Sequence, residues 1–251
     1  MIMRISRLVF TVAFALAVGL PAAACGQSQP AAQGITQQQA DQMLKELKAI
    51  REALERVSPP AGQAPADKEV SLNDLTGPAM GKPDAPLTLV EFTDLQCPYC
   101  NRFTATTFEQ LKAAYIDTGM VRYVSRDFPL DFHPQALPAA RAARCAAEQG
   151  KYYEMRLSLL RNASRLSPDF ITATAQGLKL DMVAFTPCAA STRFDAAIKR
   201  DTDVGMKLGI EGTPSFVLGR TTPTGVSGVL VVGAQPFQVF ETKIKEQLSA
   251  K

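Results

Sequence analysis

Apolar residues along the chain follow two patterns, one typical of buried strands and one typical of amphipathic helices. Mostly apolar runs rich in β-branched residues occur at Leu87 to Thr93, Val121 to Phe128 and Val229 to Gly233. Such runs are typical of strands that are covered on both faces. Residues 101–115, after the first run, have apolar side chains at helical spacing. Strands and helices that alternate in this way predict an α/β domain, which we assign to residues 70–251.

The second and third apolar runs are separated by a long segment whose pattern is mostly helical. We predict three helices in it, at Ala136 to Ala147, Tyr152 to Leu160 and Ser191 to Leu208. A further helix, Pro236 to Leu248, follows the last strand. The chain therefore contains more helix than a sheet of this size needs to cover its faces.

Residues 35–57 are predicted to form a separate helix with a coiled-coil-like seam. Apolar residues recur there in steps of three and four, at Ala40, Met43, Leu47, Ile50, Leu54 and Val57. One interpretation is an oligomerisation helix that joins copies into a dimer or trimer, and the other is an amphipathic helix packed on its own domain. The Pro-rich linker at residues 58–69 favours the first interpretation, because it would hold the helix away from the domain.

The N-terminus has the three-part layout of a secretory signal at residues 1–24. A basic start is followed by 13 uncharged residues, Leu8 to Leu20, and by the small residues before Cys25. A spanning helix needs about 20 apolar residues. Cleavage after Ala24 is one alternative, and lipidation of Cys25 with residues 25–34 as a tether is the other. Ala22 stands where the lipoprotein motif usually has Leu, whereas the odd count of five cysteines favours lipidation.

Composition and charge limit the function classes. The 251 residues are 46% apolar, which is enough for a folded core and excludes a mostly disordered chain. A net charge of +3 gives no basic field for nucleic acid. With one histidine, His133, and no second Cys-x-x-C, the chain lacks the ligands of a structural zinc site. We expect no metal and no cofactor.

The motif Cys97-Pro98-Tyr99-Cys100 lies between the first strand and the helix after it. This position places Cys97 at a helix N-terminus, where free N–H groups and the helix dipole stabilise an anion. The pKa of a thiol at such a site falls to about 3.5–7.5. We therefore expect Cys97 to be an exposed nucleophile and Cys100, one turn further in, to be the resolving thiol. Pro98 suits the first helical turn because it lacks an N–H.

Two further features accompany this motif. Glu91 precedes Cys97 by six residues, and Gly212-Thr213-Pro214 directly precedes another apolar run, Ser215 to Leu218. With these features the chain resembles the thioredoxin superfamily, and within it the exported DsbA-like oxidoreductases of the DsbA, DsbC and DsbG type. The resemblance covers about Val70 to Leu248.

The resemblance implies a thioredoxin fold with a helical domain inserted at about 134–208. It implies a cis Pro214 facing the Cys-x-x-C motif, next to Pro98 and Tyr99 in the substrate-binding surface. The Thr213 backbone would bind the substrate as an added strand. Glu91 would be a buried carboxylate that relays a proton to the resolving thiol.

The remaining cysteines and the histidine are interpreted as structural. Cys145 and Cys188 would form a disulfide in an oxidising compartment, with two buried thiols as the alternative. His133 has no nucleophile near it in sequence, and its neighbouring carboxylate is Asp131.

These observations predict an exported thiol–disulfide oxidoreductase in the periplasm or cell envelope. Its partners would be unfolded or misoxidised exported proteins and a membrane redox partner. Tyr99 and Thr213 match the isomerase-like members, which favours isomerase or reductase over pure oxidase. The alternative function is a non-enzymatic Cu(I)-binding protein or a holdase chaperone.

Overall fold

The computed structural model describes residues 35–57 and 68–249, and the chain divides into two units, residues 1–61 and 62–251. In the first unit, α1 (Gln37–Val57) covers the predicted helix. Its side chains Met43, Leu44, Leu47 and Ile50 are each more than half exposed. The predicted signal, the tether with Cys25, and most of the linker lie outside the described residues.

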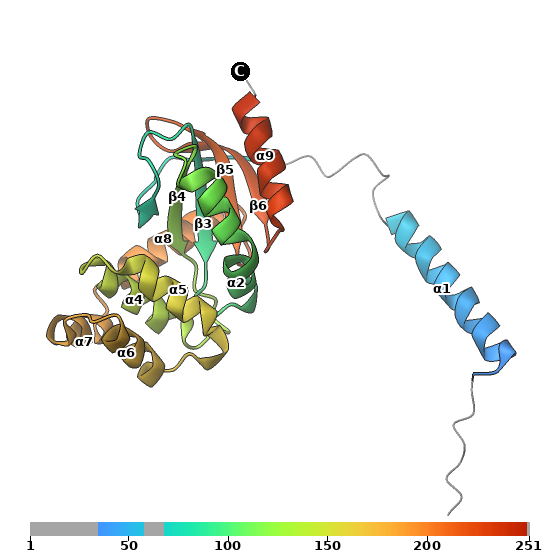
Figure 1. Ribbon diagram of the computed structural model, residues 1–251, viewed down its shortest axis with the longest axis horizontal. Helices are drawn as coiled ribbons and strands as arrows, with labels where there is room; N and C mark the ends of the chain where they lie inside the picture. The colour runs from blue at the N-terminus through green and yellow to red at the C-terminus, as the bar shows by residue number, and fades with distance from the viewer. Residues whose placement is uncertain (1–34, 58–67, 250–251) are drawn as a thin grey trace, which may run out of the picture. The chain divides into compact units, whose positions relative to one another are not determined.

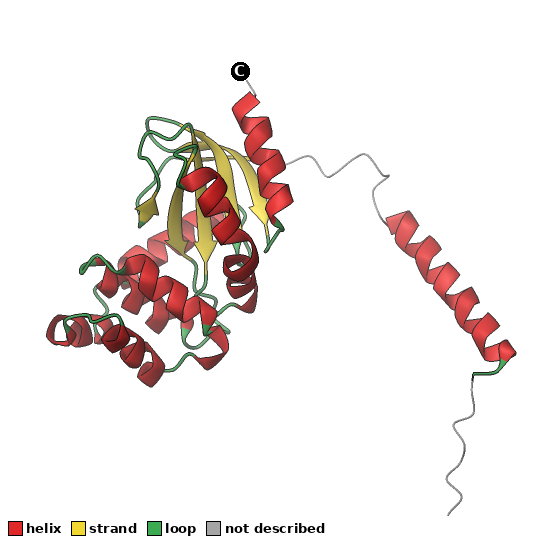
Figure 2. Ribbon diagram, viewed as in Figure 1, coloured by secondary structure: helices red, strands yellow, loops and turns green. Residues whose placement is uncertain are grey.

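The second unit contains a six-stranded mixed sheet (Figure 2). Its strands are β1 (Glu69–Leu72), β2 (Ala79–Met80), β3 (Leu87–Thr93), β4 (Val121–Asp127), β5 (Ser215–Thr221) and β6 (Val226–Val232). They are ordered β1-β6-β5-β3-β4-β2. β3 and β4 are parallel, whereas β3 and β5 are antiparallel. Every residue of β3 is buried, as its continuous apolar pattern predicts.

Helices cover both faces of the sheet (Figure 1). One face packs against α9 (Phe237–Ser249) and a long helical segment after β3. This segment comprises α2 (Pro98–Phe103), the π-helical turn η1 (Thr104–Phe108), α3 (Glu109–Leu111) and a second π-helical turn η2 (Lys112–Ile116). The other face, with Val90 and Phe92, packs against α8 (Asp195–Lys207) through Val204. The predicted α/β fold class is confirmed.

β6 begins at Val226, three residues before the start of the predicted apolar run. The strand extends through Gly228 and does not end there. Gly228 faces Gly219 of β5, and a side chain on either residue would overlap the backbone of the other strand. The two glycines therefore allow β5 and β6 to approach closely along their whole length.

Four helices form a second apolar cluster at the carboxyl-terminal end of β3 (Figure 1). They are α4 (Ala136–Ala147), α5 (Tyr152–Arg161), α6 (Pro168–Gly177) and α7 (Met182–Ala190). A short 3-10 turn, η3 (Ala163–Arg165), links α5 and α6. Leu95, Cys97 and Cys100 belong to this cluster, so the four helices cover the inner side of the motif. The insertion was expected to run to about residue 208, but α8 packs on the sheet, which limits the separate helical cluster to α4–α7.

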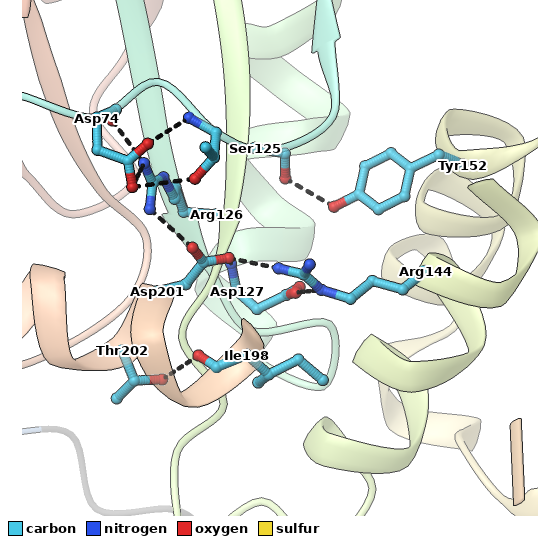
Figure 3. A network of polar contacts seen from close by, with 10 residues as sticks. Asp74, Ser125, Arg126, Asp127, Arg144, Tyr152, Ile198, Asp201 and Thr202 are labelled. Carbon is cyan, nitrogen blue, oxygen red and sulfur yellow. Dashed lines mark hydrogen bonds and ion pairs between the residues drawn. The ribbon is translucent and has the colours of Figure 1, made fainter. Parts of the chain in front are cut away.

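A buried ionic network joins this helical cluster to the sheet (Figure 3). Arg144 of α4 pairs with Asp127 at the end of β4 and with Asp201 of α8. Asp201 also accepts a hydrogen bond from Arg126, whose Nη1 lies 2.8 Å from Oδ1. The Arg126 guanidinium, which is fully buried, reaches Asp74 at 3.0 Å as well. Three carboxylates therefore compensate the buried guanidinium of Arg126 and the partly buried guanidinium of Arg144, and they fix α4 and α8 relative to β4.

Candidate active site

The chain turns sharply from β3 into α2, and this turn places the two cysteines of the motif. Cys97 is the N-cap residue of α2, and Pro98 is the first helical residue, as predicted. The Cys97 N–H donates to the Asp94 carbonyl at 3.1 Å. Both Cys97 and Cys100 are free thiols in this structure. A reduced thiol pair therefore starts the helix.

The prediction that Cys97 is an exposed residue is wrong, because only 3% of its surface is accessible. It lines an open pocket of about 380 Å³ instead. The pocket is bounded by Cys97 to Tyr99, by Leu130, Phe132 and His133 after β4, and by Glu211 to Thr213 before β5. A bound disulfide would therefore reach the sulfur through a defined opening and not across an open surface.

The two thiols differ strongly in acidity. A hydrogen bond from the Cys100 thiol lowers the pKa of Cys97 to about 6, and the Thr213 side chain and the N–H groups of α2 assist against the effect of burial. Burial raises the pKa of Cys100 well above its usual value, and the charges of Cys97 and Glu91 raise it further. At neutral pH the pair thus consists of one thiolate and one thiol.

The reaction of Cys97 with iodoacetamide should therefore reach half its maximal rate near pH 6 in the reduced protein. Because this pKa is lower than that of an unfolded thiol, ionisation stabilises the reduced folded form. The contribution grows as the pH rises through about 6 and is complete above the unfolded pKa of about 8.5. Mass spectrometry of pulse-labelled protein measures the profile, with Cys100 as the unlabelled internal control. A midpoint above pH 8 would contradict this assignment.

The loop before β5 brings Thr213 to the motif. The Thr213–Pro214 peptide bond is cis, and the Thr213 carbonyl lies 3.4 Å from Cys97 Sγ. Next to the pocket, Tyr99 and Phe132 are 56% and 74% exposed. The loop thus presents backbone polar groups beside the nucleophile, and two aromatic side chains lie at the pocket edge.

Glu91 lies on β3, facing α2, and is fully buried. Its Oε2 accepts a hydrogen bond from the Tyr123 hydroxyl and lies 2.8 Å from Nη2 of Arg156, which is also fully buried. Arg156 comes from α5, 65 residues away in sequence, and sequence analysis did not identify it. Glu91 is therefore an ion-paired carboxylate, and its other oxygen, Oε1, is buried without a hydrogen-bond partner.

His133 lines the pocket together with Cys97, although the two residues are far apart in sequence. Its carboxylate partner is Asp94 and not Asp131, with 2.8 Å between Asp94 Oδ2 and His133 Nδ1. Asp94 directly follows β3 and lies two residues before Gln96, in the loop that leads to the motif. This position was the sequence signal that could have indicated a role for Asp94 at the motif. His133 is therefore hydrogen-bonded to the loop before Cys97 and also lines the pocket that contains this thiol.

The other two cysteines form a disulfide. Cys145 of α4 and Cys188 of α7 are bonded, with their Cα atoms 5.9 Å apart. This is the pair favoured from the sequence, and the bond lies within the helical cluster. Among residues 35–57 and 68–249, no helix is long and apolar enough to cross a membrane. No group of three potential metal ligands occurs within these ranges either.

Solved structures of several oxidoreductases are similar to this chain. A thioredoxin-like oxidoreductase from Silicibacter pomeroyi is 30% identical, covers 71% of this chain and 96% of its own, and has a TM-score of 0.61. Wolbachia pipientis α-DsbA1 is 25% identical, with coverage of 74% and 92% and a TM-score of 0.61. Bacillus subtilis BdbD is 21% identical, with a TM-score of 0.60 over 69% of this chain and 94% of its own, and supports the fold alone.

Curated relatives match part of the chain. The "Na(+)/H(+) antiporter NhaA 3" of Salinispora tropica is 35% identical over 161 residues, which are 64% of this chain and 24% of the relative. The chain thus spans about a quarter of such relatives, and their transport activity is a property of those proteins. The family model described as "Thioredoxin" matches residues 73–225, more than half of the chain. The chain therefore belongs to the thioredoxin family, in which its fold is that of the DsbA-like thiol–disulfide oxidoreductases.

Proposed function

We propose that this protein catalyses thiol–disulfide exchange on exported proteins, with Cys97 as nucleophile and Cys100 as resolving thiol. The observation that carries the proposal is the unequal thiol pair at the start of α2, next to the cis Thr213–Pro214 bond. The thiolate attacks a substrate disulfide, and the buried thiol then displaces the substrate from the mixed disulfide. Glu91, close enough to influence the acidity of Cys100, is the proposed proton relay in that second step.

The same inequality argues against Cu(I) binding as the function. A Cu(I) site needs thiolate ligands. Cys100 is held as a thiol by burial, and neither the buried Glu91 nor the cis proline loop serves ion binding. The exchange reaction, in contrast, uses one ionised and one protonated sulfur.

Isomerase or reductase character is proposed ahead of oxidase character. Strong oxidants stabilise their reduced form with a very low nucleophile pKa, about 3.5 in DsbA against about 7 in thioredoxin. The value of about 6 for Cys97 is closer to the second. The reduced form of the Cys97–Cys100 pair is therefore expected to be less stabilised than in strong oxidants, which equilibration with glutathione measures.

The location proposed is the periplasm or cell envelope, either free after cleavage at Ala24 or anchored through Cys25. The predicted signal and the Cys145–Cys188 disulfide support this location, because disulfides persist outside the cytosol. Substrates would be unfolded or misoxidised exported proteins. A membrane redox partner would restore the working state of the cysteines.

The proposal is tested with insulin reduction, scrambled ribonuclease and equilibration with glutathione. We expect the protein to reduce insulin and to rescue ribonuclease. Cys97→Ser should lower both activities at least about 1,000-fold, because no thiolate remains to attack. Cys100→Ser should accumulate mixed disulfides. Tight Cu(I) binding without turnover of a disulfide peptide would refute the proposal in favour of the binding protein.

We further propose that α1 joins two or three copies of the chain. The four apolar side chains of its seam and flank are exposed in the single chain, and a second copy would cover them. Ile50→Asp should convert the oligomer to a monomer in light scattering and reduce ribonuclease rescue, because two motifs no longer share one substrate. Ala49→Asp adds the same charge beside the seam and should leave the oligomer intact. Unchanged rescue by the Ile50→Asp monomer would contradict the role of α1.

A further inference from the structure

His133 is held at the pocket by a carboxylate that also shapes the nucleophile loop. The Asp94 side chain is fully buried, and its Oδ1 accepts the Gln96 N–H at 2.7 Å. Its Oδ2 accepts the Leu130 N–H at 2.9 Å and lies 2.8 Å from His133 Nδ1. One carboxylate therefore fixes the loop that precedes Cys97 and the loop that carries His133 relative to each other.

A second contact between the same loops makes the arrangement rigid. The Gln135 N–H donates to Gln96 Oε1 at 2.7 Å. The exposed Phe132 ring packs edge-on against the His133 ring, with 4.6 Å between ring centroids. The imidazole therefore has a fixed direction and is not a freely rotating surface group.

The hydrogen bond to Asp94 determines which nitrogen of the imidazole is available. An ionised carboxylate only accepts hydrogen bonds, so Nδ1 carries a hydrogen and donates it. Among the described residues Nε2 makes no hydrogen bond, 16% of the His133 side chain is exposed, and His133 lines the same pocket as Cys97. Nε2 is thus the nitrogen that can exchange a proton with a molecule bound in the pocket.

Disulfide exchange in this pocket places negative charge on a second sulfur, and a proton supplied there would assist its departure. Attack by Cys97 breaks the substrate S–S bond and leaves a substrate thiolate, whose conjugate acid has a pKa of about 8.5. The titratable groups around His133 are Asp94, Asp131 on its own loop, and Cys97, Tyr99 and Glu211 at the pocket. Because Cys97 is the attacking thiolate, the imidazole of His133 is the side chain at this pocket that can both donate a proton to the substrate sulfur and accept one from it.

We propose that His133, oriented by Asp94, is a general acid–base residue for the substrate sulfur exchanged at Cys97. This inference rests on the proposed oxidoreductase function. Cys97 Sγ forms a bond with one substrate sulfur while the S–S bond breaks. The electron pair of the broken S–S bond goes to the departing sulfur, which takes a proton from Nε2 of the doubly protonated imidazolium and leaves His133 neutral. In the reverse direction neutral Nε2 removes the proton of an attacking substrate thiol, so no further reactant is needed.

Leaving groups of different acidity test this assignment. Reduced protein is mixed in stopped-flow experiments with 5,5′-dithiobis(2-nitrobenzoate), whose aromatic thiolate leaves without a proton, and with oxidised glutathione, whose alkyl thiolate benefits from one. His133→Asn retains a donor for Asp94 and removes Nε2. We expect a fall of about 100-fold with glutathione, the lower end of general acid catalysis, and less than twofold with the aromatic disulfide.

Two controls separate catalysis from structure. Asp131→Asn changes a charge on the same loop and should leave both rates unchanged. Added imidazole should restore part of the glutathione rate in His133→Asn, which a folding defect would not allow. Equal losses with both disulfides, or no loss with either, would overturn the inference while leaving the proposed function intact. A wild-type protein that reacts with neither disulfide would overturn the proposed function itself.

Discussion

Arg156→Met lowers the free energy of unfolding of the reduced protein by about 3–5 kcal/mol, the expected cost of removing one partner from a buried ion pair. Glu91 and Arg156 are both fully buried, with Oε2 and Nη2 2.8 Å apart. Methionine fills much of the space of arginine but leaves the carboxylate without a counter-charge. Urea unfolding followed by circular dichroism measures the difference.

The chain offers a matched control on the same helix. Arg161 of α5 pairs with Glu109 at 3.4 Å, but both side chains are more than half exposed. Arg161→Met should therefore cost less than about 1 kcal/mol. Adding Glu91→Gln to Arg156→Met removes the buried charge and should recover much of the loss. A cost below about 1 kcal/mol for Arg156→Met itself would mean that the contact between Glu91 and Arg156 does not stabilise the fold as a buried ion pair.

Arg144→Met should be similarly costly, about 3–5 kcal/mol at pH 8, because Arg144 pairs with Asp127 and Asp201 at the junction of α4, β4 and α8. Burial raises the pKa of Asp127 to about 6, and Arg144 is the leading group that opposes this rise. An acid with a raised folded pKa contributes stability at low pH that is lost as the pH rises through that pKa. Without Arg144 the pKa rises further, so the deficit should be large at pH 8 and small at pH 5.

A second arginine of α4 is the control for this prediction. Arg141 pairs with Asp195, and both side chains are partly exposed, at 19% and 35%. Arg141→Met should cost less than about 1 kcal/mol at either pH. Urea unfolding of wild type and both variants at pH 5 and pH 8 gives the comparison. A deficit for Arg144→Met that is the same at both pH values would show that Asp127 does not take up the proton.

The sequence predicted the elements whose patterns are local. β3 has the predicted bounds, because Pro86 and Asp94 flank a mostly apolar run. The helix Ala136–Ala147 also has its predicted bounds. β1 and β2 were not predicted, since they contain four and two residues and depend on pairing with β6 and β4. Short edge strands have no periodicity of their own to detect.

The site was predictable only where its residues lie close together in sequence. The Cys-x-x-C motif, Glu91 and the loop at Pro214 carry local signals. The partners of Glu91 and Asp94 come from α5 and from the loop after β4, at sequence separations that no local pattern describes. The same limit explains the incorrect prediction that Cys97 is exposed, because the residues that cover Cys97 come from the helical cluster and the loop before β5.

The origin of Arg156 in the helical cluster has a consequence for attempts to miniaturise this protein. A shortened chain that keeps the sheet, α2 and α9 but lacks α5 would retain both thiols of the motif. It would also contain a buried Glu91 without its arginine partner, and the inner side of the motif would no longer be covered. The inserted helices therefore supply the counter-charge of Glu91 and cover the motif. A shortened protein without α5 would also need a substitution of Glu91.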